Sequence, residues 1–235
     1  MPEGVGRALE RMVKHKEPDE RAERRDSSLL MNAVRRRLFE YLCLHPCSHL
    51  SETSSALKVS TNTARWHLRK LIGGDLVYMK KSGARTLYYP SDFISIDSID
   101  VFEFLSHRRM RELYLLLVDN PGSTQSDLAR SLKLSNQAAI RGTKKLENLG
   151  LVSKIQDGVY ARYFPTDLLS RNREAESPRM KAFQDSILKR LQSEGLKPKI
   201  IRRESGSIMI EIRLASEKGL LNVSTDPFST ALVAE

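Results

Sequence analysis

The sequence predicts a mainly α-helical fold with small β hairpins (α+β), in which one domain of about 65 residues occurs twice. A shift of 75 positions aligns residues 57–77 with residues 132–152 without a gap, and it also brings Gly83 onto Gly158. Apolar residues recur at helical spacing before these stretches, and apolar runs that flank a glycine-containing turn follow them. These three observations predict two copies of a helical domain that ends in a hairpin.

Each copy divides into three helices and a hairpin. In the first copy, Val34, Leu38 and Leu42 lie on one face of an amphipathic helix. In chain order, the elements expected in the two copies are a helix ending at Pro46 or Pro121, a short helix at 51–57 or 126–132, a helix capped by Ser60 or Ser135, and a hairpin turning at Gly83 or Gly158.

A helix, a helix-turn-helix and a hairpin in this order form the winged helix-turn-helix pattern. The stretch VSTNTARWHLRKLIGGDLV resembles the recognition-helix signature of ArsR/MarR-like winged helix-turn-helix transcription regulators of the archaeal type. The resemblance covers about 29–168 and implies two tandem winged helix-turn-helix domains with small β wings. In the second copy, Ala138 and Gly142-Thr143 depart from the signature. The positions that carry the resemblance are Ser60, Thr63, His67, Leu68 and Leu71.

The C-terminal part predicts a small unit of one helix and a β-hairpin. Ser177 and Pro178 fit the N-cap and first turn of a helix ending at Gly195, and a hairpin turn is expected at 204–206. This unit could dock on the repeated domains, dimerise the protein or hold an effector. The expected domains are a charged N-terminal arm at 1–28, winged helix 1 at 29–93, a connector helix at 94–106, winged helix 2 at 107–168 and a small α+β domain at 177–235.

The charge distribution favours nucleic acid as the partner. The net charge is +10, and the excess lies mainly in the two copies, with +6 over 33–93 and +4 over 107–168. A basic excess of this kind attracts phosphate groups. We therefore expect a sequence-specific regulator that binds double-stranded DNA at promoter regions, with the first copy as the main reader and the second as a further grip or protein contact.

The third helix of each copy is expected to enter the major groove, where its first turns meet base edges. Arginine can bind guanine and asparagine can bind adenine with two hydrogen bonds, whereas contacts to phosphates set affinity and register. The residues expected at base edges are Thr61, Asn62, Arg65, Asn136, Gln137 and Arg141. Those expected at phosphates are Ser60, Arg69, Lys70, Lys80, Lys81, Arg85, Ser135, Lys144, Lys145 and Arg162.

Two ring side chains of the third helix have both structural and functional interpretations. We expect Trp66 to pack against the wing or the first helix, with a sugar or base-edge contact as the alternative. His67 is expected to be packed and hydrogen-bonded rather than a ligand. In the second copy, Ile140 replaces Arg65 and Gly142 lowers helix propensity, which favours the first copy as the reader.

Other function classes receive less support from the sequence. The chain has no phosphate-binding G-x-x-x-x-G-K-[ST], no H-E-x-x-H and no G-x-S-x-G motif, so neither an enzyme nor a cofactor is expected. A tandem winged-helix adaptor in a transcription or chromosome-organising assembly stays open, as does a non-specific nucleoid protein. Transcription machinery and a second copy of the chain are further candidate partners. No apolar run is long enough for a membrane span, and a cytoplasmic location is expected.

The stretch CLHPCSH collects four potential metal ligands in one loop. The repeat aligns it with VDNPGST at 118–124, where no cysteine or histidine occurs. We therefore expect Cys43 to be a small buried apolar residue at the end of the first helix and no metal to be bound. A metal or redox site at Cys43, Cys47 and His49 remains the alternative.

Overall fold

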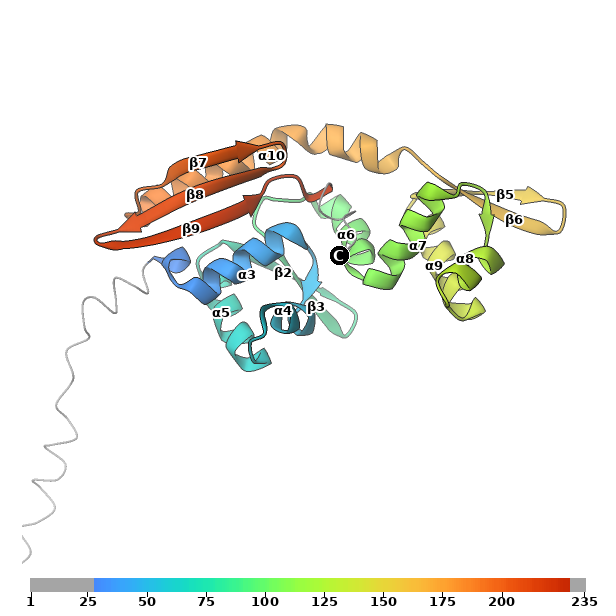
Figure 1. Cartoon of the computed structure of the whole chain (residues 1–235), viewed down its shortest axis with the longest axis horizontal. Helices are drawn as coiled ribbons and strands as arrows, with labels where there is room; N and C mark the ends of the chain where they lie inside the picture. Colours follow the sequence, from blue (N-terminus) through green and yellow to red (C-terminus); the bar gives the residue numbers. More distant parts are fainter. Residues whose placement is uncertain (1–27, 229–235) are drawn as a thin grey trace, which may run out of the picture.

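The computed structural model describes residues 28–228. The expected N-terminal arm at 1–28 therefore lies outside the described residues, apart from Ser28. The described chain contains two units with the same order of elements, followed by a long helix and a three-stranded sheet (Figure 1).

The first unit follows a 3-10 turn, η1 (Leu29–Met31). Asn32 caps the helix after it, because its side-chain oxygen accepts the N–H groups of Val34 and Arg35 at 3.0 and 3.1 Å. The elements of this unit are α3 (Ala33–Leu44), β1 (Ser48–His49), α4 (Leu50–Leu57), α5 (Thr61–Gly73), β2 (Val77–Ser82) and β3 (Arg85–Pro90).

Helix α5 begins where the sequence predicts. The Ser60 hydroxyl accepts the N–H of Thr63 at 3.0 Å, so Ser60 is the N-cap. Ala64, Leu68 and Leu71 are buried on one face, which turns the polar residues between them to the outside. The expected inward and outward faces of this helix are therefore confirmed.

The wing of the first unit contains one strand more than the predicted hairpin. Strands β2 and β3 pair in antiparallel register from Val77 opposite Pro90, and Gly83 in their turn has a φ of +58°. The two-residue strand β1 adds to the other edge of β3, with Ser48 opposite Tyr88. A strand of two residues has no periodicity that a sequence pattern could reveal.

The second unit has the same elements in the same order. Its wing pairs Val152 opposite Pro165, which is the register of Val77 and Pro90 moved by 75 positions. Its elements are α7 (Arg108–Asp119), β4 (Ser123–Thr124), α8 (Gln125–Ser131), α9 (Asn136–Asn148), β5 (Val152–Asp157) and β6 (Tyr160–Pro165).

The connector between the units is helical and packed. It consists of a 3-10 turn, η2 (Ile96–Ser98), and helix α6 (Ile99–Ser106), which leads directly into α7. Phe102 and Leu105 are fully buried, and the Phe102 ring lies 5.0 Å from that of Phe228 between centroids. A short, buried connector holds the two units in one arrangement.

Helix α10 (Leu168–Ser193) corrects the expected start of the C-terminal unit. The sequence predicts the first turn at Pro178, but the helix begins ten residues earlier and continues through Pro178. Arginine, glutamate and alanine before the proline favour helix, and α10 continues although Pro178 lacks an N–H and its ring crowds the carbonyl four residues earlier. The predicted apolar face remains, since Phe183, Ile187 and Leu191 are buried.

The C-terminal sheet docks on the first unit. It contains β7 (Lys199–Glu204), β8 (Ser207–Leu214) and β9 (Glu217–Ser224), in that spatial order. Strand β9 runs beside α3, where Glu40 accepts the N–H of Asn222 at 2.7 Å, and α10 passes above the first unit (Figure 1). Of the three roles considered for this unit, the structure thus shows docking within the chain.

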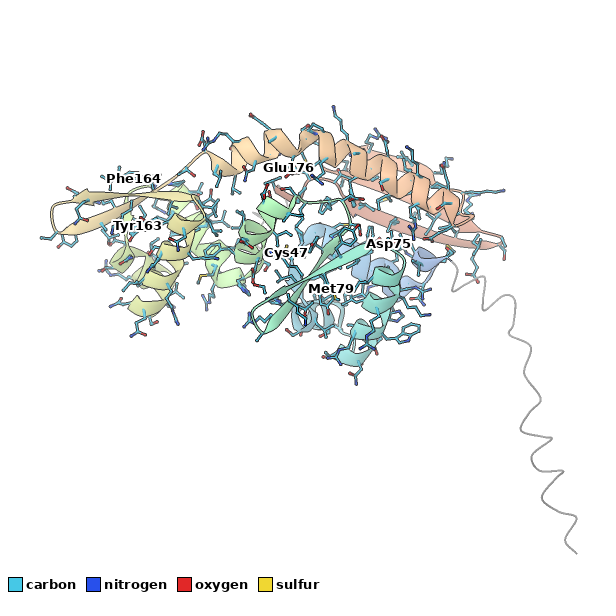
Figure 2. All side chains as sticks on the ribbon, turned by 180° about the vertical axis from the view of Figure 1, so that it is seen from behind. Cys47, Asp75, Met79, Tyr163, Phe164 and Glu176 are labelled. Carbon is cyan, nitrogen blue, oxygen red and sulfur yellow. The ribbon has the colours of Figure 1, made fainter. Side chains whose placement is uncertain are left out.

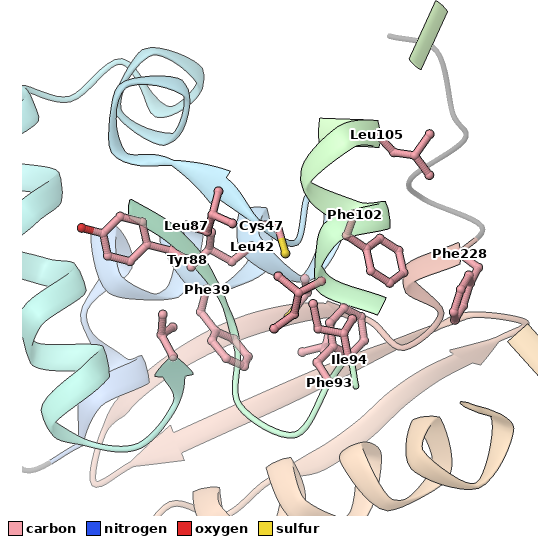
Figure 3. Packing of buried hydrophobic residues seen from close by; sticks show 14 of the residues in the cluster. Phe39, Leu42, Cys47, Leu87, Tyr88, Phe93, Ile94, Phe102, Leu105 and Phe228 are labelled. Atoms are coloured by element: carbon pink, nitrogen blue, oxygen red, sulfur yellow. The ribbon is translucent and has the colours of Figure 1, made fainter. Parts of the chain in front are cut away.

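Most of the buried apolar residues form one cluster that includes both units and the C-terminal sheet. Figure 3 shows Phe39 and Leu42 of α3 in this cluster with Phe93, Phe102 and Phe228. The Phe93 ring also lies 4.5 Å from that of Phe183, between centroids, which joins α10 to the first unit. Among residues 28–228, no helix combines the length and apolar character needed to cross a membrane.

Candidate nucleic-acid interface

The outer face of α5 presents the side chains expected at base edges. Thr61, Asn62 and Arg65 are all exposed, and Arg65 Nη1 donates to Asn62 Oδ1 at 3.3 Å. The Ser60 hydroxyl, expected at a phosphate, lies 2.8 Å from the Thr63 hydroxyl and caps the helix. Arg65 and Asn62 thus lie side by side on the first two turns, while Ser60 serves mainly the helix end.

Trp66, on the next turn of α5, does not pack as expected. Its side chain is 51% exposed instead of packed against the wing or the first helix. The ammonium group of Lys70 lies 5.6 Å from the centre of the Trp66 ring, in the arrangement of a cation–π contact. The predicted packing was wrong because the buried face of α5 is filled by Ala64, Leu68 and Leu71.

His67 is buried as expected, but its Nδ1 atom has no hydrogen-bond partner within residues 28–228. Burial and the positive charge of Arg35 lower the pKa of His67 below its usual value of 6.5. The folded chain therefore keeps this imidazole neutral where an unfolded chain would protonate it.

This shift predicts a pH-dependent loss of stability. The unfolded state binds the additional proton below about pH 6.5, so stability should fall as the pH decreases from about 7 through the folded pKa of His67. A His67→Gln variant should lose less stability between about pH 7 and pH 5 than the parent chain. Urea unfolding at several pH values measures this difference, and parallel curves for both proteins would contradict the assignment.

The basic side chains of the first wing point in different directions. Lys80 forms an ion pair with Asp100 of α6 at 3.1 Å, so it is directed toward the connector. Lys81 is exposed, and Arg85 Nη1 lies 3.5 Å from Nε2 of His49. Of the three basic residues of this wing that are expected at phosphates, Lys81 and Arg85 are exposed and form no ion pair with Asp100.

Two neighbouring hollows connect these side chains with the second unit. The first, of about 690 Å³, is lined by Thr61 and Arg65 of α5 and by Arg85 of the wing. The second, of about 680 Å³, is lined by Arg85 and by Arg141 and Lys145 of α9. Since Arg85 lines both hollows, cations from both units border one continuous surface. Five further residues that were predicted to contact base edges or phosphates are also exposed: Arg69, Ser135, Asn136, Gln137 and Lys144.

Helix α9 is less suited to read bases than α5. Ile140 occupies the position of Arg65 and is largely exposed, whereas Ser135 caps the helix by accepting the N–H of Ala138 at 3.2 Å. Gly142 has a packing role that the sequence analysis missed, because a Cβ there would lie 2.9 Å from Leu113 of α7. The glycine therefore permits the close approach of α7 and α9.

The wing of the second unit exposes several apolar side chains near its tip. Ile155, Val159 and Tyr160 are exposed there. Arg162, expected at a phosphate, forms an ion pair with Asp157 and donates to the Gly122 carbonyl at 3.1 Å. The two wings thus differ in charge, although their strands pair in the same register. Figure 2 shows both wings, with Met79 labelled in the first and Phe164 in the second.

The cysteine and histidine residues of CLHPCSH do not converge on one site. Cys43 and Cys47 are fully buried free thiols, and burial raises the pKa of both. Figure 3 shows the Cys47 sulfur within the apolar cluster, and the backbone of Cys47 has a φ of 67°, like that of Gly122 at 84°. Cys43 is thus buried as expected, although its counterpart in the second unit, Val118, is 45% exposed.

His49 instead lies beside two residues that the sequence analysis did not single out. Nδ1 of His107 lies 3.6 Å from Oε1 of Glu52, and the His49 and His107 ring centroids are 5.4 Å apart. Burial alone would raise the pKa of Glu52, but its hydrogen bonds with His107 and with the His49 amide outweigh burial and lower the pKa. Glu52 is therefore a carboxylate at neutral pH.

Comparison with known proteins is consistent with this geometry. Residues 107–153 match a family model described as winged helix-turn-helix DNA-binding. The chain is 31% identical over 140 residues to an uncharacterized HTH-type transcriptional regulator of Methanocaldococcus jannaschii, which covers 59% of this chain and 35% of the relative. It is 37% identical over 79 residues to an uncharacterized HTH-type transcriptional regulator of Bacillus subtilis, with 31% and 53% covered.

The alignments thus span about a third and about half the length of these curated relatives. Among solved structures, ScpB from Mycobacterium tuberculosis matches 58% of this chain and 93% of its own at 16% identity, but the TM-score of 0.23 is too low to support a conclusion. Residues 107–153 are thus similar to the winged helix-turn-helix DNA-binding family, and the chain is similar to HTH-type transcriptional regulators.

Proposed function

We propose that the chain is a sequence-specific regulator that binds double-stranded DNA through two tandem winged helix-turn-helix units. The observation that carries the proposal is the exposed pair of Arg65 and Asn62 on the first turns of a rigidly packed helix. Arginine and asparagine at these positions match the hydrogen-bonding groups of guanine and adenine in the major groove. The similarity to HTH-type transcriptional regulators supports the regulatory role.

The second unit would provide additional contacts to the DNA phosphates. Arg141 and Lys145 of α9 border the hollow that Arg85 of the first wing also lines. DNA that follows this surface would place phosphates near cations from both units, and such contacts add affinity without sequence information. The buried connector would hold the two units at a fixed spacing along the duplex.

Selection of bound genomic fragments, followed by fluorescence anisotropy at several salt concentrations, tests the proposal. We expect an enriched sequence that binds about 1,000-fold or more tightly than unrelated DNA. Equal affinity for every fragment would instead indicate a non-specific nucleoid protein.

A second function receives support from the wing of the second unit. Its exposed Ile155, Val159 and Tyr160, together with the paired Arg162, suit a protein contact better than phosphates. An adaptor that binds protein through both units would show no measurable affinity for DNA. The same anisotropy titrations therefore distinguish the adaptor from the regulator.

The two lysines of the first wing provide a matched pair for a further prediction. A Lys81→Ala variant should lower the slope of log affinity against log salt concentration by about 0.9, because one phosphate contact is lost. Lys80→Ala should change the slope less, since Lys80 is paired with Asp100 at 3.1 Å. An equal change for both variants would show that the ion pair opens on the DNA.

A further inference from the structure

Three side chains that the proposed DNA contact does not use converge beside the recognition helix. His49, Glu52 and His107 each offer a ligand atom, and the three atoms lie within 4.8 Å of one another. All three line the hollow that also contains Arg65 and Arg85. They come from the N-terminal end of α4 and from the residue before α7, so they join the first unit to the start of the second.

Hydrogen bonds orient two of these side chains toward the others. Oε2 of Glu52 accepts the N–H of His49 at 2.8 Å, which leaves Oε1 facing His107. Nδ1 of His49 lies 3.3 Å from the carbonyl oxygen of Thr86. When Nδ1 carries the proton and donates to this carbonyl, Nε2 presents its lone pair to the hollow, as in most metal-binding histidines.

The structure of the helix end explains only part of this cluster. Glu52 caps α4 through the His49 amide, and Asp127 caps α8 in the same way through the Thr124 amide at 3.1 Å. The second unit thus forms the same cap with threonine and aspartate and without an imidazole. The cap does not involve the His107 ring, so the contact of His107 with Glu52 requires a different explanation.

We propose that His49, Glu52 and His107 bind one divalent transition-metal ion of the Zn²⁺ type, with water as a fourth ligand. Two imidazoles and a carboxylate are a common ligand set for zinc with an open position. Ligand atoms around tetrahedral zinc lie about 3.3 Å apart, so the cluster must contract by about 1.5 Å. The side chains of His107 and Glu52 are 33% and 34% exposed, which leaves both room to turn.

The bound ion would affect the contact between the first and second units. Arg85 Nη1 lies 3.5 Å from Nε2 of His49, so the metal replaces the guanidinium group at this nitrogen and releases the exposed Arg85 toward the surface beside α5. A bond to His107 also fixes the start of α7 against α4. This inference goes beyond DNA binding, because the metal site is assembled from residues outside the predicted DNA contacts.

Isothermal titration of the chelator-treated full chain with Zn²⁺ tests the site. We expect one ion per chain, and Co²⁺ should give the visible absorption of a four-coordinate site. Loss of a second-shell partner already lowers metal affinity 10- to 100-fold, so His107→Gln and Glu52→Gln should each lower it by more than about 100-fold. His45→Gln, a histidine of the same segment outside the cluster, should leave the affinity unchanged.

Three results would overturn the proposal. They are the absence of stoichiometric binding, an affinity that neither His107→Gln nor Glu52→Gln alters, and a thiolate-to-cobalt charge-transfer band, which would place the ion on Cys43 or Cys47. Melting temperatures of the metal-free variants show whether each remains folded. Since the titration contains no DNA, its result is independent of the proposed regulatory function.

Discussion

Replacing Arg65 with alanine is expected to weaken binding to the selected DNA site by about 10- to 100-fold, because one bidentate contact to a base contributes about 1–3 kcal/mol. Arg65 is exposed on α5 and held near Asn62 by a hydrogen bond of 3.3 Å, so its removal should leave the fold unchanged. Anisotropy titrations with the selected site and with single-base variants measure both the affinity and the specificity. Discrimination should be lost mainly at one base pair.

The matched control is Arg141→Ala in the second unit. Arg141 is also exposed, but Ile140 occupies the position equivalent to Arg65, so Arg141 is expected to serve mainly a phosphate. Its replacement should weaken binding to all sequences by a similar, smaller factor. A loss from Arg141→Ala that equals or exceeds that from Arg65→Ala would make the second unit the main reader.

Replacing Phe183 with alanine should lower the free energy of unfolding by about 3–5 kcal/mol. The Phe183 side chain is 1% exposed and lies 4.5 Å from the Phe93 ring, measured between ring centroids. The substitution would leave a cavity between α10 and the first unit, because the surrounding helix and sheet can close only part of the space. Chemical denaturation of the full chain measures the change.

Tyr160→Ala is the control for this substitution, since the Tyr160 side chain is 61% exposed at the tip of the second wing. Its loss should change the free energy of unfolding by less than about 0.5 kcal/mol. A similarly small effect for Phe183→Ala would mean that α10 does not pack on the first unit in solution.

The repeated elements could be predicted because the signals that define them are local. Serine at positions 60 and 135 caps a helix through an N–H three residues away, and Gly83 and Gly158 both adopt a φ of +58° in their turns. Such signals depend on near neighbours in the chain and so are readable from sequence. The outward position of Arg65 follows from the same helical period.

The exposure of Trp66, the ion pair of Lys80 and the early start of α10 were not predicted from the sequence. The first two depend on which partner fills a given space, because the buried face of α5 was already filled and Asp100 of α6 was within reach of Lys80. Helix-forming residues before Pro178 extended α10 through a position that usually marks a helix start.

The sequence by itself determined the repeat, the caps and turns of each copy, and the basic residues that α5 presents. Only the tertiary structure decided that the C-terminal sheet lies on α3 and that His107 meets His49 and Glu52. The difference has a physical reason, because caps and periodicity arise within a few residues of chain. Contacts between residues 55 or more positions apart form only when the whole core packs, and no local pattern encodes which surfaces will meet.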